Sequence, residues 1–440
     1  MRAFGLALIL ALAAFSGLAA ADDLGRRGLM GLELRQPEKG PLIIVKVLNP
    51  SLSAAQKDDQ VISVDGQPAP SVPAIGAILA GRKGGDPVTL KVKRGASELD
   101  IAGTVMPAPE PALDGEKLAL SSVTLASGAR IRTMMLPAKS DALKKNGLTP
   151  AVLMLGGINC STSEVFALTD HPDVRLYRLL TKAGFAVFII DKPGVGDSEG
   201  ERCPVGGFDV EIEAYSKAAE ALAASPGIDK QRLFAIGLSM GAVQAPLISR
   251  AVPLKGIVTW GGAVMPWYDY LLATFRRRTV LEGVDAVAAE PTLRHWRTVL
   301  AAAFVDGLTR DEIAAKMPET LAAFEAETGP LDAIGGRSLK FQKECDKAGV
   351  VAAWQAFQGQ LLSLHGEFDW VSEDYDHRLA SVIVNAKRPG AAIFEVVPGL
   401  DHGGTQFKTL ADSFSHPGEG KKSDAFNLRA ADWLIQQAKS

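Results

Sequence analysis

The strongest structural signal in this chain is the run Leu233-Phe234-Ala235-Ile236-Gly237-Leu238-Ser239-Met240-Gly241. It opens with continuously apolar residues, which predict a buried strand, and residues 242–250 continue in a pattern that suits a helix. A serine between two glycines at a sharp strand-to-helix turn is held in a strained conformation with its hydroxyl exposed at the edge of the sheet. Ser239 is therefore the candidate nucleophile, and a purely structural turn is the alternative.

Further apolar segments on both sides of this run are expected in the same sheet. They alternate with segments of helical pattern, which indicates a largely parallel sheet. Residues 118–136 predict two opening antiparallel strands around the turn Ser127-Gly128. The buried strands expected in the sheet are 151–155, 185–190, 233–236, 257–260, 361–364 and 393–397.

A serine hydroxyl becomes a good nucleophile only when a base takes its proton and an acid orients that base. The run Pro398-Gly399-Leu400-Asp401-His402-Gly403 follows the last predicted strand, so His402 is the candidate base. Another loop, Gly366-Glu367-Phe368-Asp369-Trp370-Val371, contains two acids directly after a strand. Asp369 is the preferred acid and Glu367 is its rival.

Residues 117–440 thus resemble the α/β-hydrolase superfamily, in which the nucleophile, the acid and the histidine follow one another in this chain order. The run Asp191-Lys192-Pro193-Gly194-Val195-Gly196-Asp197-Ser198-Glu199-Gly200 is similar to the turn after the superfamily's fourth strand. Its glycines do not have the Gly-x-Gly-x-x-Gly spacing of dinucleotide-binding proteins, so nucleotide binding is not expected. The resemblance implies a mostly parallel sheet and a helical cap.

The resemblance also implies two backbone donors for a developing oxyanion. One is the N–H of Met240, and the other is the N–H of Ile158, with Asn159 as its neighbour. The cap is expected at residues 263–358, where the capping box Thr309-Arg310-Asp311-Glu312 predicts a helix that continues to residue 323. The aromatic residues of this insertion are expected either in its core or at the substrate pocket: Trp267, Tyr268, Trp296 and Trp354.

The cysteines and the N-terminus indicate export. Residues 1–21 combine Arg2, a short apolar run and small residues, as in a secretory signal peptide, with an uncleaved anchor as the alternative. The protein is thus expected in the periplasm or outside the cell. Cys160 and Cys203 lie in loops that the resemblance makes neighbours, which predicts a disulfide and leaves Cys345 unpaired.

A small β-rich domain is predicted at residues 24–106, before a proline-rich spacer at 107–116. The run Arg27-Gly28-Leu29-Met30-Gly31-Leu32-Glu33-Leu34 resembles the peptide-capturing loop and strand of a PDZ domain of exported bacterial proteases. The resemblance implies that Leu29, Met30, Gly31 and Leu32 receive the C-terminus of a peptide that adds to the sheet edge. The alternative is a domain that only packs against its neighbour.

The composition narrows the classes of partner and cofactor. A formal net charge of -3 gives no reason to expect nucleic acid or a membrane as partner. The chain contains no Cys-x-x-Cys and no His-Glu-x-x-His, so neither a metal nor another cofactor is expected. The expected function is hydrolysis of a small carboxylic ester through an acyl-enzyme. A prolyl-oligopeptidase-like peptidase or amidase and a non-catalytic peptide-binding protein are the alternatives.

Overall fold

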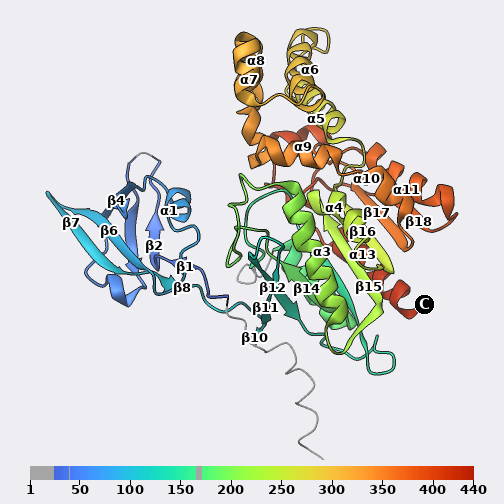
Figure 1. Cartoon of the computed structure of the whole chain (residues 1–440), viewed down its shortest axis with the longest axis horizontal. Coiled ribbons are helices and arrows are strands. Elements are labelled where there is room, and N and C mark those ends of the chain that lie inside the picture. The colour runs from blue at the N-terminus through green and yellow to red at the C-terminus, as the bar shows by residue number, and fades with distance from the viewer. Residues whose placement is uncertain (1–23, 39, 165–170) are drawn as a thin grey trace, which may run out of the picture.

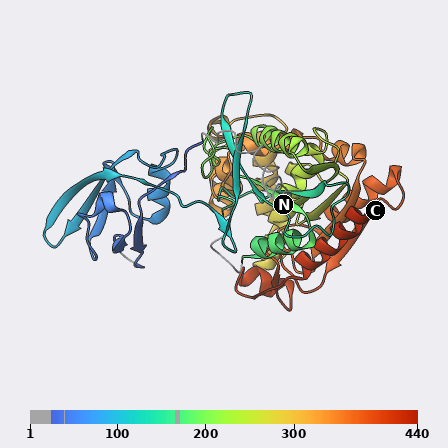
Figure 2. The ribbon, with the colours of Figure 1, turned by 90° about the horizontal axis from the view of Figure 1, so that it is seen from below.

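The structure is a computed structural model that describes residues 24–38, 40–164 and 171–440. The predicted signal segment, residues 1–21, lies outside the described residues. A small β-rich domain lies to one side of a larger α/β domain in both views (Figures 1 and 2). Among the described residues, no helix combines the length and the apolar character that a membrane span requires.

The small domain is built on an antiparallel sheet with the strand order β2-β3-β4-β6-β7. Its strands are β1 (Gly28–Leu29), β2 (Leu32–Arg35), β3 (Ile43–Val47), β4 (Gln60–Val64), β5 (Gln67–Pro68), β6 (Pro87–Arg94), β7 (Ser97–Thr104) and β8 (Met106–Pro107). Helix α1 (Val72–Ile78) begins where the Ser71 side chain accepts a hydrogen bond from the Ala74 N–H. Strand β2 lies at one end of the sheet order, and among the described residues it pairs with β3 alone.

The segment expected to be an extended spacer, residues 107–116, contains short paired strands instead. Pro107 belongs to β8, which pairs with β1, and β9 (Ala112–Leu113) pairs with β10 (Glu116–Lys117). Leu113 is 1% exposed because it packs against the larger domain. The prolines limit the backbone freedom of this segment, but the apolar side chains between them still pack.

The larger domain has an eight-stranded sheet that contains all the predicted strands. Its spatial order is β11 (Ala119–Thr124), β12 (Arg130–Leu136), β14 (Ala186–Ile190), β13 (Thr149–Leu155), β15 (Ile228–Leu238), β16 (Gly256–Trp260), β17 (Gln360–Gly366) and β18 (Ala392–Val397). Strands β11 and β12 are antiparallel to their neighbours, and all the others run parallel. The carboxyl ends of the parallel strands therefore meet at one edge, where ligand sites form in such sheets.

Helices cover both faces of this sheet and bury its apolar residues. One core includes residues of α3 (Phe208–Ala224), α4 (Met240–Ile248) and α11 (Asp374–Lys387). The other core includes residues of α2 (Pro172–Ala183) and α13 (Ala425–Lys439). The strands are continuously apolar because side chains of both of their faces are packed under helices. After β18 follow β19 (Thr405–Gln406), α12 (Leu410–Ser415) and β20 (Lys421–Lys422).

The predicted helical cap lies between β16 and β17, and most of its helices gather at one end of the molecule (Figure 1). It consists of α5 (Trp267–Leu281), α6 (Glu290–Phe304), α7 (Arg310–Lys316), α8 (Pro318–Thr328), the 3-10 segment η2 (Leu331–Gly336), α9 (Leu339–Lys347) and α10 (Val350–Ala356). The predicted helix from Thr309 to residue 323 is wrong in one respect, since it is two helices. Pro318 disfavours a helical Met317, whose φ is -146°, and so α7 ends there.

The predicted disulfide joins Cys160 and Cys203, with a Cα–Cα distance of 5.7 Å, and Cys345 is free and buried. The two cysteines are 43 positions apart. In the chain-entropy model a crosslink over such a loop stabilises the folded state by about 4 kcal/mol. The bond ties the loop after β13 to the loop after β14.

Candidate active site

Ser239 occupies the turn between β15 and α4 with a strained backbone, φ 54° and ψ -116°. Such a conformation is rare for a residue with a side chain and persists only where the surrounding structure enforces it. The glycines two positions before and after Ser239 let the backbone segments of the turn approach one another more closely than a side chain would allow. A Cβ at Gly237 would lie 2.4 Å from the Gly241 carbonyl oxygen, and a Cβ at Gly241 would lie 2.1 Å from that of Leu155.

The structure brings Ser239 together with the predicted base and acid. The Nε2 atom of His402 lies 3.0 Å from the Ser239 Oγ, and its Nδ1 lies 2.8 Å from the Asp369 Oδ2. Asp369 follows β17 and His402 follows β18, so all three residues lie at the carboxyl edge of the sheet. With Nδ1 donating to the carboxylate, Nε2 is free to accept the serine proton.

The rival acid, Glu367, does not contact the histidine. Its Oε2 accepts a hydrogen bond from the Gly399 N–H at 2.8 Å and thereby holds the loop after β18. Asp369 instead accepts hydrogen bonds from the Ser372 hydroxyl at 2.6 Å and from the N–H groups of Val371 and Ser372. The geometry therefore favours Asp369 over Glu367.

The pKa values of the acid and the base move apart. Burial raises the pKa of the Asp369 carboxyl, but the charge and hydrogen bond of His402 and the hydrogen bonds of Ser372 outweigh it and hold that pKa well below its usual range. For His402, burial lowers the pKa of the imidazole, and the Asp369 carboxylate more than offsets this, so the pKa is raised. Asp369 is thus ionised whenever His402 titrates.

The two predicted oxyanion donors belong to segments that lie beside Ser239. Met240 is the first residue of α4, and Ile158 is in the loop after β13. That loop approaches Ser239 closely, because a Cβ built on Gly157 would lie 3.5 Å from the Ser239 Cβ. Ile158, Ser239 and Met240 line one cavity together.

This cavity has a volume of about 190 Å³ and is lined in part by the cap. Its lining from α5 and η2 is mainly apolar and includes Leu271, Phe275 and Ile334. The polar lining side chains besides Ser239 are Tyr270, Thr274 and Gln342. Within the described part of the chain, no charged residue lines the cavity.

A profile of the family described as serine aminopeptidase, S33, matches residues 174–402, just over half of the chain. The chain belongs to this family. The matched range includes Ser239, Asp369 and His402, and it confirms the α/β-hydrolase fold. No curated protein matches the chain.

Solved structures similar to this S33 chain are distant in sequence. A DcsB complex with its substrate analogue is 14% identical, with a TM-score of 0.45, over 73% of this chain and 98% of that chain. Est1E from Butyrivibrio proteoclasticus is 12% identical, with a TM-score of 0.44, over 73% of this chain and 99% of that chain. An esterase from Pyrococcus furiosus is 16% identical, with a TM-score of 0.42, over 73% of this chain and 91% of that chain.

The cap residues at the S33 site are only partly those singled out in the sequence. Trp267 lines the cavity, whereas Tyr268, Trp296 and Trp354 do not. Leu271 and Phe275 were not predicted as lining residues, although both follow Trp267 on one face of α5 at helical spacing. Ser372 was not predicted either, because a short side chain in a loop carries no periodic signal.

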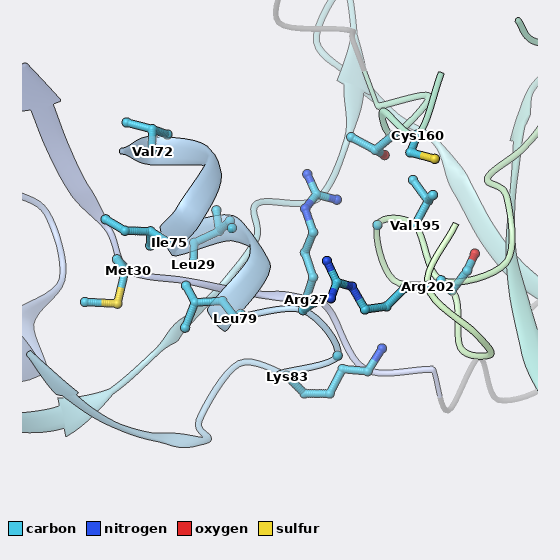
Figure 3. A pocket seen from close by; sticks show the side chains of 18 of the residues that line it. Arg27, Leu29, Met30, Val72, Ile75, Leu79, Lys83, Cys160, Val195 and Arg202 are labelled. Carbon is cyan, nitrogen blue, oxygen red and sulfur yellow. The ribbon is translucent and has the colours of Figure 1, made fainter. Parts of the chain in front are cut away.

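A second, larger hollow of about 840 Å³ lies between the small domain and the S33 domain (Figure 3). The predicted peptide-binding residues line it: Leu29, Met30, Gly31 and Leu32. Apolar side chains of α1, among them Ile75, form another wall, and Arg202 reaches it from the S33 domain. The family match does not extend to residues 24–106, so the PDZ-like identity stays a prediction.

Ion pairs hold the two domains together beside this hollow. Arg26 contacts both Glu164, at 2.6 Å, and Asp197, and Arg27 contacts Glu164 at 2.7 Å. Asp197 is fully buried and also pairs with Arg132 at 3.0 Å. Partners of opposite charge are needed here because an unpaired buried charge is costly.

Proposed function

We propose that this chain is a serine hydrolase that cleaves a carboxylic ester through Ser239, His402 and Asp369. The observation that carries the proposal is the unbroken chain of hydrogen-bond distances, 3.0 Å from Ser239 to His402 and 2.8 Å from His402 to Asp369. The strained turn at Ser239 and the ionised Asp369 support the same assignment.

The proposed reaction has two steps. His402 accepts the Ser239 proton while the serine oxygen attacks the ester carbonyl, and Asp369 stabilises the resulting imidazolium. The N–H groups of Met240 and Ile158 stabilise the oxyanion, and His402 then gives its proton to the leaving alcohol. Water, activated by His402, releases the acyl group from Ser239. One such oxyanion donor contributes about 10²- to 10³-fold to the rate.

The cavity at Ser239 favours an apolar acyl group. Its volume of about 190 Å³ compares with the roughly 150 Å³ apolar cavity that binds benzene, so an acyl group of about six to eight carbons fits. An aminopeptidase has to bind the α-ammonium group of its substrate. The described lining residues include no carboxylate for that purpose, which favours an ester over an N-terminal peptide bond.

Labelling with a fluorophosphonate tests the nucleophile. Wild-type protein should be labelled and Ser239→Ala should not. Ser372→Ala is the control, because the Ser372 hydroxyl only donates to Asp369 and its loss should leave some labelling. If the wild-type protein is not labelled, a non-catalytic peptide-binding function is the alternative that remains.

A series of p-nitrophenyl esters from acetate to laurate tests the substrate class. We expect kcat/KM to peak near six to eight carbons and to exceed that for aminoacyl p-nitroanilides. Faster cleavage of the anilides would support the peptidase or amidase alternative instead.

We infer a second function, binding of a peptide C-terminus, for the hollow between the domains. Its support is an exposed-edge strand, β2, beside an apolar wall, with Arg27, Lys83 and Arg202 near one end of α1 (Figure 3). Arg27 is paired with Glu164 and Lys83 donates to the Asp197 carbonyl, so Arg202 is the cation that suits a terminal carboxylate. A fluorescent apolar peptide should bind more tightly as the free acid than as the amide, and Arg202→Ala should remove that difference. Equal binding of acid and amide would refute it.

Export remains part of the proposal and rests on residues 1–21 and on the cysteine pair. Expression with the native N-terminus in a bacterium should give a periplasmic protein that starts near Asp22. A full-length product held in the membrane would favour an uncleaved anchor.

A further inference from the structure

The loop that carries Ile158 is held by two buried cations that the proposed reaction does not use. Lys192 follows β14 and is 6% exposed, and Arg337 follows η2 in the cap and is 1% exposed. Their donors contact successive carbonyl oxygens of one loop, those of Gly157, Ile158 and Asn159.

The contacts of Lys192 are unusual for a buried ammonium group. Its Nζ donates to the Gly157 carbonyl at 2.6 Å and to the Asn159 carbonyl at 2.8 Å. Taking a charge out of water is costly, and buried lysines are normally paired with carboxylates. Among the described residues, Lys192 forms no direct ion pair, although the charges of Glu211 and Asp191 act on it from a greater distance. The loop carbonyls are therefore the direct partners that compensate the buried charge.

Arg337 connects the same loop to the cap and to the nucleophile helix. Its Nη1 donates to the Ile158 carbonyl at 3.3 Å, and its Nη2 lies 2.6 Å from the Glu211 carboxylate. The other oxygen of Glu211 accepts a hydrogen bond from Gln244 of α4 at 2.9 Å. The guanidinium also lies over the Phe341 ring, 3.7 Å from its centroid.

The planar peptide bond relates these contacts to the direction of the oxyanion donor. In a trans peptide, the carbonyl of one residue and the N–H of the next lie in one plane and point in opposite directions. The bond from Lys192 to the Gly157 oxygen therefore sets the direction of the Ile158 N–H. The bond from Arg337 to the Ile158 oxygen sets the direction of the Asn159 N–H in the same way.

We propose that Lys192 is a positioning residue that aims the Ile158 N–H at the oxyanion through the Gly157 carbonyl. A cation on that carbonyl also polarises the peptide and strengthens its N–H as a donor. The inference rests on the proposed serine hydrolase reaction. It assigns the second donor to Ile158 rather than Asn159. The shorter hydrogen bond, 2.6 Å from Lys192, holds the peptide that contains the Ile158 N–H, whereas the bond from Arg337 to the next peptide is 3.3 Å.

The test compares Lys192→Met with Arg337→Met and with a matched control, Arg232→Met. Arg232 is also buried, at 4% exposed, and donates to the carbonyls of Leu143 and Leu148, far from Ser239 in the sheet. Each protein is assayed with an apolar p-nitrophenyl ester and with its thiono analogue, whose sulfur accepts hydrogen bonds poorly. Circular dichroism and thermal melting establish that each variant is folded.

For Lys192→Met we expect kcat to fall by about 10- to 100-fold with KM changed less than about threefold, because the donor acts in the transition state. The preference for ester over thiono ester should fall as well. Arg232→Met should keep the wild-type preference whatever it does to stability, and Arg337→Met should lower the preference less than Lys192→Met.

Three results would overturn the inference. They are an unchanged preference in Lys192→Met, a larger loss of preference in Arg337→Met, and a Lys192→Met and Lys192→Gln pair that both fail to fold. The last would make Lys192 a stability residue. A wild type that cleaves no ester at all would instead contradict the proposed function, so the two failures are distinguishable.

Discussion

At the scale of single residues, the charge of Asp369 decides when His402 can work. The carboxylate raises the pKa of His402, and the base is active only when it is neutral. We therefore expect kcat/KM to rise with pH and to reach half of its maximum above the ordinary imidazole value of about 6.5. A pH–rate profile with an apolar p-nitrophenyl ester measures this, and a half-maximum below that value would contradict it.

Replacing the acid tests the same interaction from the other side. Asp369→Asn removes the charge that raises the pKa of His402, so the rise in activity should move to lower pH. The loss of the correct tautomer should lower kcat by up to about 10⁴-fold. The matched control is Glu367→Gln in the same loop, which should keep the profile because Glu367 contacts Gly399 and not His402. Equal losses in the two variants would reopen the choice of acid.

At the scale of elements, helix α5 lines the cavity at Ser239 with one face. Phe275 lines the cavity and packs against Trp296 and Phe324. In Phe275→Leu the smaller side chain should lengthen the cavity, and the best p-nitrophenyl ester should become longer by one or more methylene groups. Val280→Ala changes an exposed residue of the same helix and should leave the optimum in place. An unchanged optimum in Phe275→Leu would mean that the acyl chain lies elsewhere.

The break between α7 and α8 belongs to the same scale. This break can be predicted from the sequence, because Pro318 disfavours a helical conformation of the residue before it. The capping box at Thr309 correctly predicts the beginning of α7, with both of its hydrogen bonds present. The predicted helix, which continues through Pro318 to residue 323, was therefore too long.

At the scale of the whole molecule, Arg26 joins the two domains. It contacts Glu164 and the fully buried Asp197 of the α/β domain. Arg26→Met leaves both carboxylates with fewer partners, so we expect a lower melting temperature and faster proteolysis near residues 107–116. Arg82→Met, which breaks a more exposed pair with Asp65 inside the small domain, should change both much less. Equal effects would show that Arg26 does not hold the domains together.

Much of the α/β domain could be predicted because its signals are local. Apolar strands, the glycines around Ser239 and residues that directly follow a strand each depend on a few neighbouring positions. The chain order of Ser239, Asp369 and His402 then placed these residues at one edge of a parallel sheet. The pairing of Cys160 with Cys203 followed from the same strand order.

The remaining features depend on contacts between segments that are distant in the chain. Arg337 belongs to no motif, and the turn that contains Lys192 does not indicate what its side chain contacts; both contacts appear only where the two side chains reach the loop of Ile158. Likewise, the small domain has its own sequence pattern, but nothing in that pattern places its groove beside Arg202. Local patterns determine the candidate nucleophile and the sheet, because strands and turns depend on residues that are close together in the chain. The packing of the cap determines which side chains surround Ser239, and the packing of the two domains determines which side chains line the larger hollow between them.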